Sequence, residues 1–425
     1  MPDRRITPKI KDAVDFNLTL KPCDQYTLNN GARVYSLNGG AEDVLMIEFV
    51  FSAGNCYETQ NLVAAATNHL LKNGTSTKSA FQINEHFEYY GAYLNRACQN
   101  ETATLTLHCL SKHLQELLPV VREILTDSIF PGEELAIFKQ NSIQKLSVNL
   151  QKCDFVANRL IDVYLYGEEH PYGKFSNQEA YEALNTENLT SFYNNHYKNG
   201  HAILFAAGKL PPDFSAILNQ HFGDLPINQY IPPVKNVGIT SAEKKFRVIN
   251  YAKGVQGAIR LARPFPNRHH PDFQKVMVLN SLFGGFFGSR LMANIREEKG
   301  YTYGIHSYIQ NHVQESAWVV STEAGKDVCE ATIAEVYKEM ELLRTELVDE
   351  EELLLVKNYM MGTNLGDLDG PFHIIARWKT LVLNNLTEEY FYDSMNTIKS
   401  VPAEELRQLS DKYLQPEDFF ELVVI

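Results

Sequence analysis

The sequence predicts an α+β protein of two homologous domains, each a mainly antiparallel sheet covered by helices. The chain has 425 residues, which is too many for one hydrophobic core. Its strand-like and helical segments follow one another irregularly, unlike strictly alternating βα units. In addition, two parts of the first half recur in the second half at nearly the same offset, which indicates an internal repeat.

The repeat consists of one helical and one strand-like motif. Glu-Glu-Leu at 133–135, followed by Ile-Phe-Lys, matches Glu-Glu-Leu at 351–353, followed by Leu-Val-Lys. His-Tyr before the strand AILFAAG likewise matches Lys-Tyr before FFELVVI. Residues 225–242 carry three prolines, few charges and no periodicity, as linkers do. We therefore predict domains at 1–224 and 243–425 with a linker at 225–242.

The first domain shows its elements most clearly. Alternating or branched apolar residues predict strands, and apolar residues at helical spacing predict helices. Asn30-Gly31 is a strong turn signal inside a hairpin at 29–38. The other predicted strands are 44–53, 92–95, 101–110 and 201–207, and the predicted helices are 62–71, 80–90, 112–124, 133–150 and 189–196.

Composition and charge narrow the function classes. A hydrophobic content of 44% and a charged content of 21% are ordinary for a soluble globular protein. The net charge of −13 disfavours nucleic acid and anionic membranes as partners. The six cysteines are scattered without a CxxC pair, which favours free thiols in a reducing compartment. We find no signal peptide and no membrane-spanning run, so we expect a cytoplasmic protein.

The segment 281–304, SLFGGFFGSRLMANIREEKGYTYG, organises the second domain. Its glycines, Gly284, Gly285 and Gly288, predict a loose turn that leads into about three helical turns, and a tight packing turn explains them equally well. Gly300 is expected to end this helix in left-handed backbone, and an aromatic strand follows. Arg296 therefore lies in the last helical turn, and Tyr303 lies at the start of the strand.

A helix end beside a strand start can aim a guanidinium and a phenol into one space. Both groups donate hydrogen bonds, so Arg296 and Tyr303 are suited to hold a peptide carbonyl. The alternative is a surface arginine paired with Glu297 or Glu298, together with a core tyrosine. Spacing alone also leaves the choice of tyrosine open, because Tyr301 lies on the same side of a regular strand.

Two segments together resemble the pitrilysin/insulinase-like zinc peptidase family. They are SRLMANIREEKGYTYG and AAATNHLLKNGTSTKSAFQINEHFEYYGAYLNR, and with the repeat they are most similar to its bacterial branch, which resembles mitochondrial processing peptidase. The resemblance implies two similar domains that form half of a clamshell. It also implies an inverted zinc motif, H-x-x-E-H, in which two histidines bind the metal and the glutamate activates water.

This sequence departs from that motif. Counting back from Gly-Thr at 74–75, the motif falls on Ala65, Ala66, Thr67, Asn68 and His69, so only its last histidine is present. The downstream helix, where the family carries another glutamate ligand, has no Asp or Glu from 138 to 152. Catalytic zinc usually has three protein ligands, so we predict no metal site and no cofactor in this chain. Whether His69 binds any metal is left open.

The family's arginine and the tyrosine seven residues later bind substrate opposite the zinc, and Arg296 and Tyr303 match them. The resemblance thus implies a non-catalytic subunit of a heterodimeric zinc endopeptidase. Its partner would be a homologous chain that carries H-x-x-E-H and the zinc. The substrate would be an unfolded peptide added to an exposed sheet edge. Segment 93–99 corresponds to that edge, so Asn95 is a candidate peptide contact, although a plain strand explains this segment equally well.

Two other functions stay open at this stage. A structural or assembly protein with the peptidase fold would bind a partner without needing Arg296 or Tyr303. A self-sufficient peptidase with unusual ligands would hold stoichiometric zinc, and metal analysis of the purified chain separates it from the others.

Overall fold

The computed structural model describes residues 11–228, 231, 241–250 and 254–425. They form two compact units. One comprises Met1–Lys21, Val255–Asp369 and Leu381–Glu421, and the other comprises Pro22–Gly254, Gly370–Thr380 and Leu422–Ile425. The domain bounds expected from the sequence stay a prediction, and most of the predicted linker 225–242 lies outside the described residues.

The unit that begins at Pro22 is built on a six-stranded sheet of order β1-β2-β6-β3-β5-β4. Its neighbouring strands run antiparallel except β2 and β6, which are parallel. This confirms the predicted mainly antiparallel sheet. The strands are β1 (Asp24–Thr27), β2 (Arg33–Asn38), β3 (Val44–Phe51), β4 (Tyr93–Cys98), β5 (Ala103–Leu110) and β6 (Ala202–Gly208).

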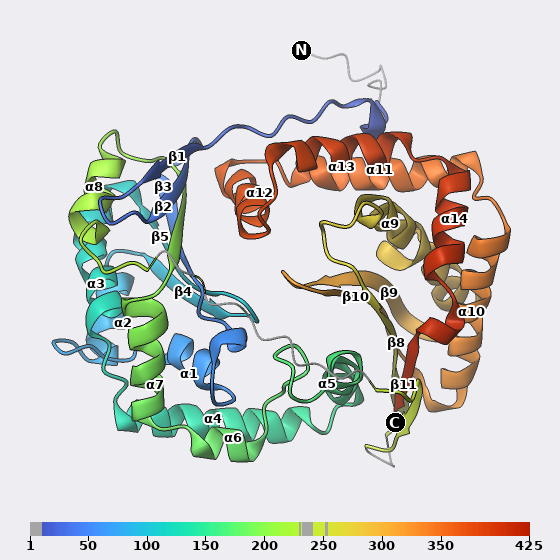
Figure 1. The fold of residues 1–425 in the computed structure, drawn as a ribbon, viewed down its shortest axis with the longest axis horizontal. Coiled ribbons are helices and arrows are strands. Elements are labelled where there is room, and N and C mark those ends of the chain that lie inside the picture. Colours follow the sequence, from blue (N-terminus) through green and yellow to red (C-terminus); the bar gives the residue numbers. More distant parts are fainter. Residues whose placement is uncertain (1–10, 229–230, 232–240, 251–253) are drawn as a thin grey trace, which may run out of the picture. The chain divides into compact units, whose positions relative to one another are not determined.

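Helices bury their apolar faces against this sheet, as Figure 1 shows for the part coloured blue to green. Every residue of β6 is buried, as expected of a central strand. The one charge inside β3, Glu48, is neutralised by Lys379 of α12 at 2.7 Å. The helices of this unit are α1 (Val63–Leu70), α2 (Ala80–Tyr89), α3 (Leu114–Asp127), α4 (Gly132–Asn149), α5 (Cys153–Tyr166), α6 (Gln178–Ala183), α7 (Thr186–Tyr193), α8 (Phe214–Phe222) and most of α12 (Pro371–Leu383). Of these, α1, α2, α3, α4, α7 and α8 contribute buried residues to the core against the sheet.

A second sheet has five strands in the order β7-β11-β8-β10-β9. They are β7 (Lys245–Val248), β8 (Gln256–Phe265), β9 (Thr302–Asn311), β10 (Ser316–Gly325) and β11 (Phe420–Val424). Helices α10 and α14 pack side by side near β8 and β10 (Figure 1). The helices that accompany this sheet are α9 (Phe273–Asn280), α10 (Cys329–Thr345), α11 (Glu350–Gly366), α13 (Glu388–Ser400) and α14 (Ala403–Tyr413).

The two sheets repeat one topology. From the second strand of the first sheet onward, β2, β6, β3, β5 and β4 correspond in order to β7, β11, β8, β10 and β9. The Glu-Glu-Leu motifs open α4 and α11, and the His-Tyr and Lys-Tyr motifs precede β6 and β11. The predicted internal repeat is therefore confirmed. Its last members, β4 and β9, are both edge strands.

The predicted glycine turn at 284–288 begins later than expected, because only Phe287 and Gly288 lie in a turn. Gly284 and Gly285 do not form a loose turn but continue α9 as a π-helical turn, η5 (Ser281–Gly285). A Cβ on Gly284 would lie 2.6 Å from the Cβ of Ser307 on β9. Gly284 is therefore needed for close packing of helix on strand rather than for a turn. Helices α5, α6 and α8 were not predicted.

The six cysteines form no disulfide, which confirms the expectation of free thiols. Among the described residues, the model contains no helix with both the length and the apolarity needed to span a bilayer.

Candidate functional site

The helical turn that carries Arg296 is anchored in the core and ends as predicted. Arg296 lies in the π-helical turn η6 (Met292–Glu298). Ile295 in this turn and Leu291 just before it are completely buried. Gly300 follows with φ +66°, and the N–H of Tyr301 closes the helix on the carbonyl of Ile295 at 3.0 Å. The left-handed glycine thus turns the chain directly into β9.

A bulge at the start of β9 sets the direction of Tyr303. Ile305 pairs with Thr322 of β10, whereas Thr302 pairs with Ala324, so β9 holds one extra residue between these pairs. Ile305 is buried, and regular alternation would turn Tyr303 inward on the same face. The bulge reverses this direction, and Tyr303 is 93% exposed. The alternative of a core tyrosine is therefore wrong.

Two threonine hydroxyls hold the bulge in place. Thr322 Oγ1 lies 2.9 Å from the carbonyl of Gly304 and 2.8 Å from Thr302 Oγ1. Thr302 Oγ1 in turn lies 2.7 Å from the carbonyl of Glu323 and accepts the N–H of Gly304 at 3.1 Å. These bonds replace the sheet hydrogen bonds that the extra residue interrupts.

Arg296 lies against the same bulge. Its Nε donates to the carbonyl of Tyr303 at 3.0 Å, and its guanidinium carbon lies 4.7 Å from the ring centre of Phe287. Its Nη1 is also 3.5 Å from Glu297, so the surface pair expected as the alternative is present. Glu297 is exposed and Arg296 is half-buried, and ion pairs at the surface contribute little to stability. A ligand can therefore displace Glu297 at small cost.

The structure brings Arg296 and Tyr303 together through backbone, not through a bond between their side chains. The Tyr303 hydroxyl forms no hydrogen bond with any residue that the structure describes, so it is available as a donor. Tyr301 is only partly exposed. Of the two tyrosines that the spacing left open, Tyr303 is thus the accessible one.

Asn68, at the position expected for the motif's glutamate, is part of the core. Asn68 is 3% exposed, and its amide donates to the carbonyl of Thr104 on β5 and to the Tyr197 hydroxyl, both at 3.1 Å. Asn68 therefore ties α1 to β5 and to the π-helical turn η4 (Asn194–Lys198) that follows α7. An amide held in this way takes no proton from water.

Ala65 and His69, together with Asn68, line a cavity of about 630 Å³ between α1, β4, α4, α5 and α6. His69 stacks on Phe138 of α4, with the ring centres 4.8 Å apart. Its backbone carbonyl accepts a hydrogen bond from Arg96 of β4. Burial and the nearby cations, chiefly Arg96, keep the pKa of His69 below its usual value. Ala65 presents only a methyl group to this cavity.

These residues do not fit a catalytic zinc ion. Zinc takes imidazole, thiolate or carboxylate ligands, usually three from the protein. The described residues contain no group of three or more His, Cys, Asp or Glu side chains arranged to hold a metal. Where the downstream helix passes the cavity, α4 presents Asn141 and Lys145, an amide and a cation. No step of a reaction is therefore assigned to a metal in this chain.

Asn95 lies on β4, the edge strand of the first sheet, and borders the same cavity. Its side chain is exposed. An edge strand presents unpaired backbone groups that an extended peptide can pair with. The edge position is thus confirmed, and the contact of Asn95 with a peptide stays a prediction.

Several residues that shape these sites were not predicted. Thr302, Thr322 and Phe287 hold the Arg296–Tyr303 bulge, and nothing local in the sequence marks a bulge between two strands. Arg96 and Lys145 line the cavity and contribute two positive charges to it. The absence of Asp and Glu from residues 138–152 was the available signal for this change.

Family models match most of the chain. The model described as insulinase (peptidase family M16) matches residues 33–163, and that described as peptidase M16 inactive domain matches residues 183–360. The uncharacterized zinc protease YmxG of Bacillus subtilis is 23% identical over 358 residues, or 83% of this chain and 86% of YmxG. The mitochondrial-processing peptidase subunit beta of Bos taurus is 25% identical over 423 residues, or 91% and 81% of the two chains.

Solved structures share the fold at low sequence identity. A peptidase M16 inactive domain from Pseudomonas fluorescens has a TM-score of 0.86 at 22% identity, covering 95% of this chain and 98% of that one. The periplasmic protease PqqL of Escherichia coli has a TM-score of 0.79 at 13% identity, covering 100% of this chain and 48% of PqqL. The chain therefore belongs to the insulinase family, peptidase family M16.

Proposed function

We propose that this chain is the non-catalytic subunit of a heterodimeric zinc endopeptidase. It supplies Arg296 and Tyr303 to bind a peptide and to stabilise the oxyanion formed at the partner's zinc site. The partner is a homologous chain with an intact H-x-x-E-H motif, and the zinc belongs to that partner. The substrate is an unfolded peptide.

The exposed, bulged tyrosine is the observation that carries this proposal. A solvent-exposed phenol held by an irregular strand adds little to stability, so its placement points to a ligand. Arg296 is fixed on the same backbone and offers further donors beside it. Preorganised donors of this kind act where negative charge develops on a carbonyl oxygen.

The residues at the expected zinc motif also support a role for a second chain. Asn68 is engaged in the core, and the described residues that line the cavity beside it form no zinc site. The metal and the general base then come from a second chain. The free cysteines support a reducing compartment, and we include a cytoplasmic location in the proposal.

Reconstitution tests the proposal. The full chain is purified alone, and an affinity pull-down from the source cells identifies the companion that carries H-x-x-E-H. Each protein is then assayed with a quenched fluorescent peptide, separately and mixed, with zinc and then with a chelator. We expect cleavage only in the mixture and loss of cleavage with the chelator. Cleavage by this chain alone, with one tightly bound zinc per chain, would contradict the proposal.

A further inference from the structure

We propose that the cavity beside β4 binds a carboxylate of the peptide substrate, supplied either by its C-terminus or by an acidic side chain. The inference rests on the proposed function for the peptide nature of the ligand. It goes further because it assigns to the substrate a preferred chemical group, a carboxylate, and places its binding site in the unit that contains β4.

The first argument is the charge of the cavity. Its lining includes the cations Arg96 and Lys145 and a single carboxylate, Glu134. Glu134 is already engaged, because its Oε2 accepts the amide of Asn73 at 2.8 Å. The ammonium of Lys145 has neither a hydrogen bond nor an ion pair in the part of the chain that the structure describes. A cationic cavity in a protein of net charge −13 favours a negatively charged ligand.

The second argument is the state of the Arg96 guanidinium. Its Nη1 is fixed by the carbonyl of His69 and by Asn73 Oδ1, whereas Nε and Nη2 donate to no described residue. In the same protein Arg290 uses its Nε and Nη2 to bind both oxygens of Glu352, each at 2.8 Å. The Nε and Nη2 edge of Arg96, which can bind a carboxylate in a bidentate manner, is therefore free, and the bonds of Nη1 hold the guanidinium in position.

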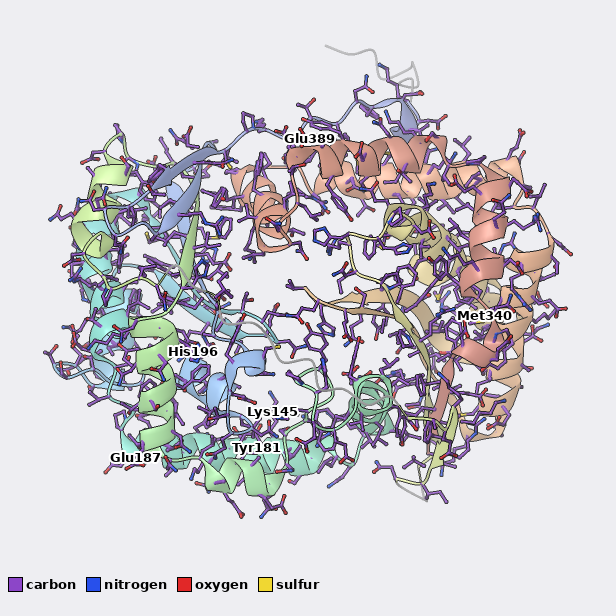
Figure 2. All side chains as sticks on the ribbon, in the orientation of Figure 1. Lys145, Tyr181, Glu187, His196, Met340 and Glu389 are labelled. Carbon is purple, nitrogen blue, oxygen red and sulfur yellow. The ribbon has the colours of Figure 1, made fainter. Side chains whose placement is uncertain are left out.

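The third argument is the path of a peptide. Residues 95–98 of the edge strand β4 line the cavity, so a peptide that pairs with β4 runs along its rim. Figure 2 labels Lys145 on α4 and Tyr181 on α6, and both side chains line this cavity. The amides of Asn95 and Asn141 add neutral donors to the lining. A carboxylate on the peptide thus meets a guanidinium, an ammonium and two amides.

The test uses the full chain alone and three heptapeptides of Ser, Ala and Leu, each labelled at the N-terminus with the same uncharged BODIPY dye and followed by fluorescence anisotropy. The first has a free C-terminal carboxylate, the second is its C-terminal amide, and the third is that amide with one internal Glu. We expect at least one of the two peptides that carry a carboxylate to bind roughly tenfold tighter than the neutral amide. A preference for the first alone identifies the C-terminus as the source, and a preference for the third identifies an acidic side chain.

Variants locate the effect. Lys145→Gln should reduce the preference by about threefold to tenfold, and Lys145→Glu should abolish it. Arg96→Gln should abolish it too, and circular dichroism checks that this variant folds. Lys139→Gln is the matched control, because Lys139 lies on the same helix, binds the carbonyl of Glu182 and does not line the cavity.

Equal binding of all three peptides, absence of binding, or a preference unchanged in both Lys145 variants would overturn the inference. This outcome is separable from failure of the proposed function. The anisotropy experiment needs no partner and leaves Arg296 and Tyr303 untouched, whereas the proposed function fails when the reconstituted peptidase does not depend on those two residues.

Discussion

Replacing Asn68 with glutamate puts the family's acidic residue back into α1 and should destabilise the protein. Asn68 is 3% exposed, and its amide donates to the Thr104 carbonyl and the Tyr197 hydroxyl. A carboxylate cannot donate to the carbonyl, and loss of the hydrogen bond to this partly buried acceptor costs about 1 kcal/mol. Burial of the new charge adds to this cost. We therefore expect Asn68→Glu to lower the free energy of unfolding by about 3–5 kcal/mol.

Urea denaturation followed by circular dichroism measures this loss. Ala65→His is the matched control, because Ala65 lies one turn earlier on α1 and borders the cavity. The control should cost less than about 1 kcal/mol. The Ala65→His/Asn68→Glu double variant should hold no stoichiometric zinc after dialysis. An Asn68→Glu variant within 1 kcal/mol of the parent, or a double variant with one firmly bound zinc, would refute this reasoning.

Three further predictions follow from the other contacts. Arg296→Ala should lower turnover of the reconstituted peptidase by roughly tenfold or more, and Lys299→Ala, whose ammonium pairs with Glu298, should not change it. Gly300→Ala should cost about 1–2 kcal/mol in urea denaturation because of its φ of +66°. At Gly366 an added Cβ would also meet no atom within 4 Å, and this glycine lies at a helix end without positive φ. Gly366→Ala should therefore not lower the free energy of unfolding. Burial raises the pKa of Glu58 to about 7, so the folded state binds the extra proton and the stability of the parent should fall as pH rises from about 4.5 to 7. Glu58→Gln should remove this fall of stability with pH, which urea denaturation of both proteins at several pH values measures. An equal dependence of the free energy of unfolding on pH in the parent and the variant would contradict the prediction.

Much of the fold followed from local patterns. The predicted strands and helices of the first domain lie close to the observed ones because periodicity, the Asn30-Gly31 turn and the closing glycines act locally. The repeat was visible because helix starts and strand entrances carry short recurring motifs. Helices α5, α6 and α8 were missed. The position of β4 and β9 at the sheet edges depends on strand order, which short-range patterns do not encode.

The candidate site was predictable in part. Arg296 and Tyr303 were found from their spacing and the resemblance, and the structure places them at one bulge. The direction of Tyr303 was not predictable, because it depends on one extra residue relative to β10 and on Thr322, which is nineteen residues away in the sequence. Arg96 was missed for a similar reason: its contacts with His69 of α1 and with Asn73 join residues 27 and 23 positions apart.

The peptidase assay with Tyr303→Phe tests the central claim most directly. The variant removes one hydroxyl that is exposed and bonded to no described residue, so the fold and the interface should be unaffected. With the zinc-carrying partner saturated, kcat should fall by roughly tenfold to thousandfold while the affinity between the chains stays unchanged. An unchanged kcat would show that this chain contributes no oxyanion donor to its partner.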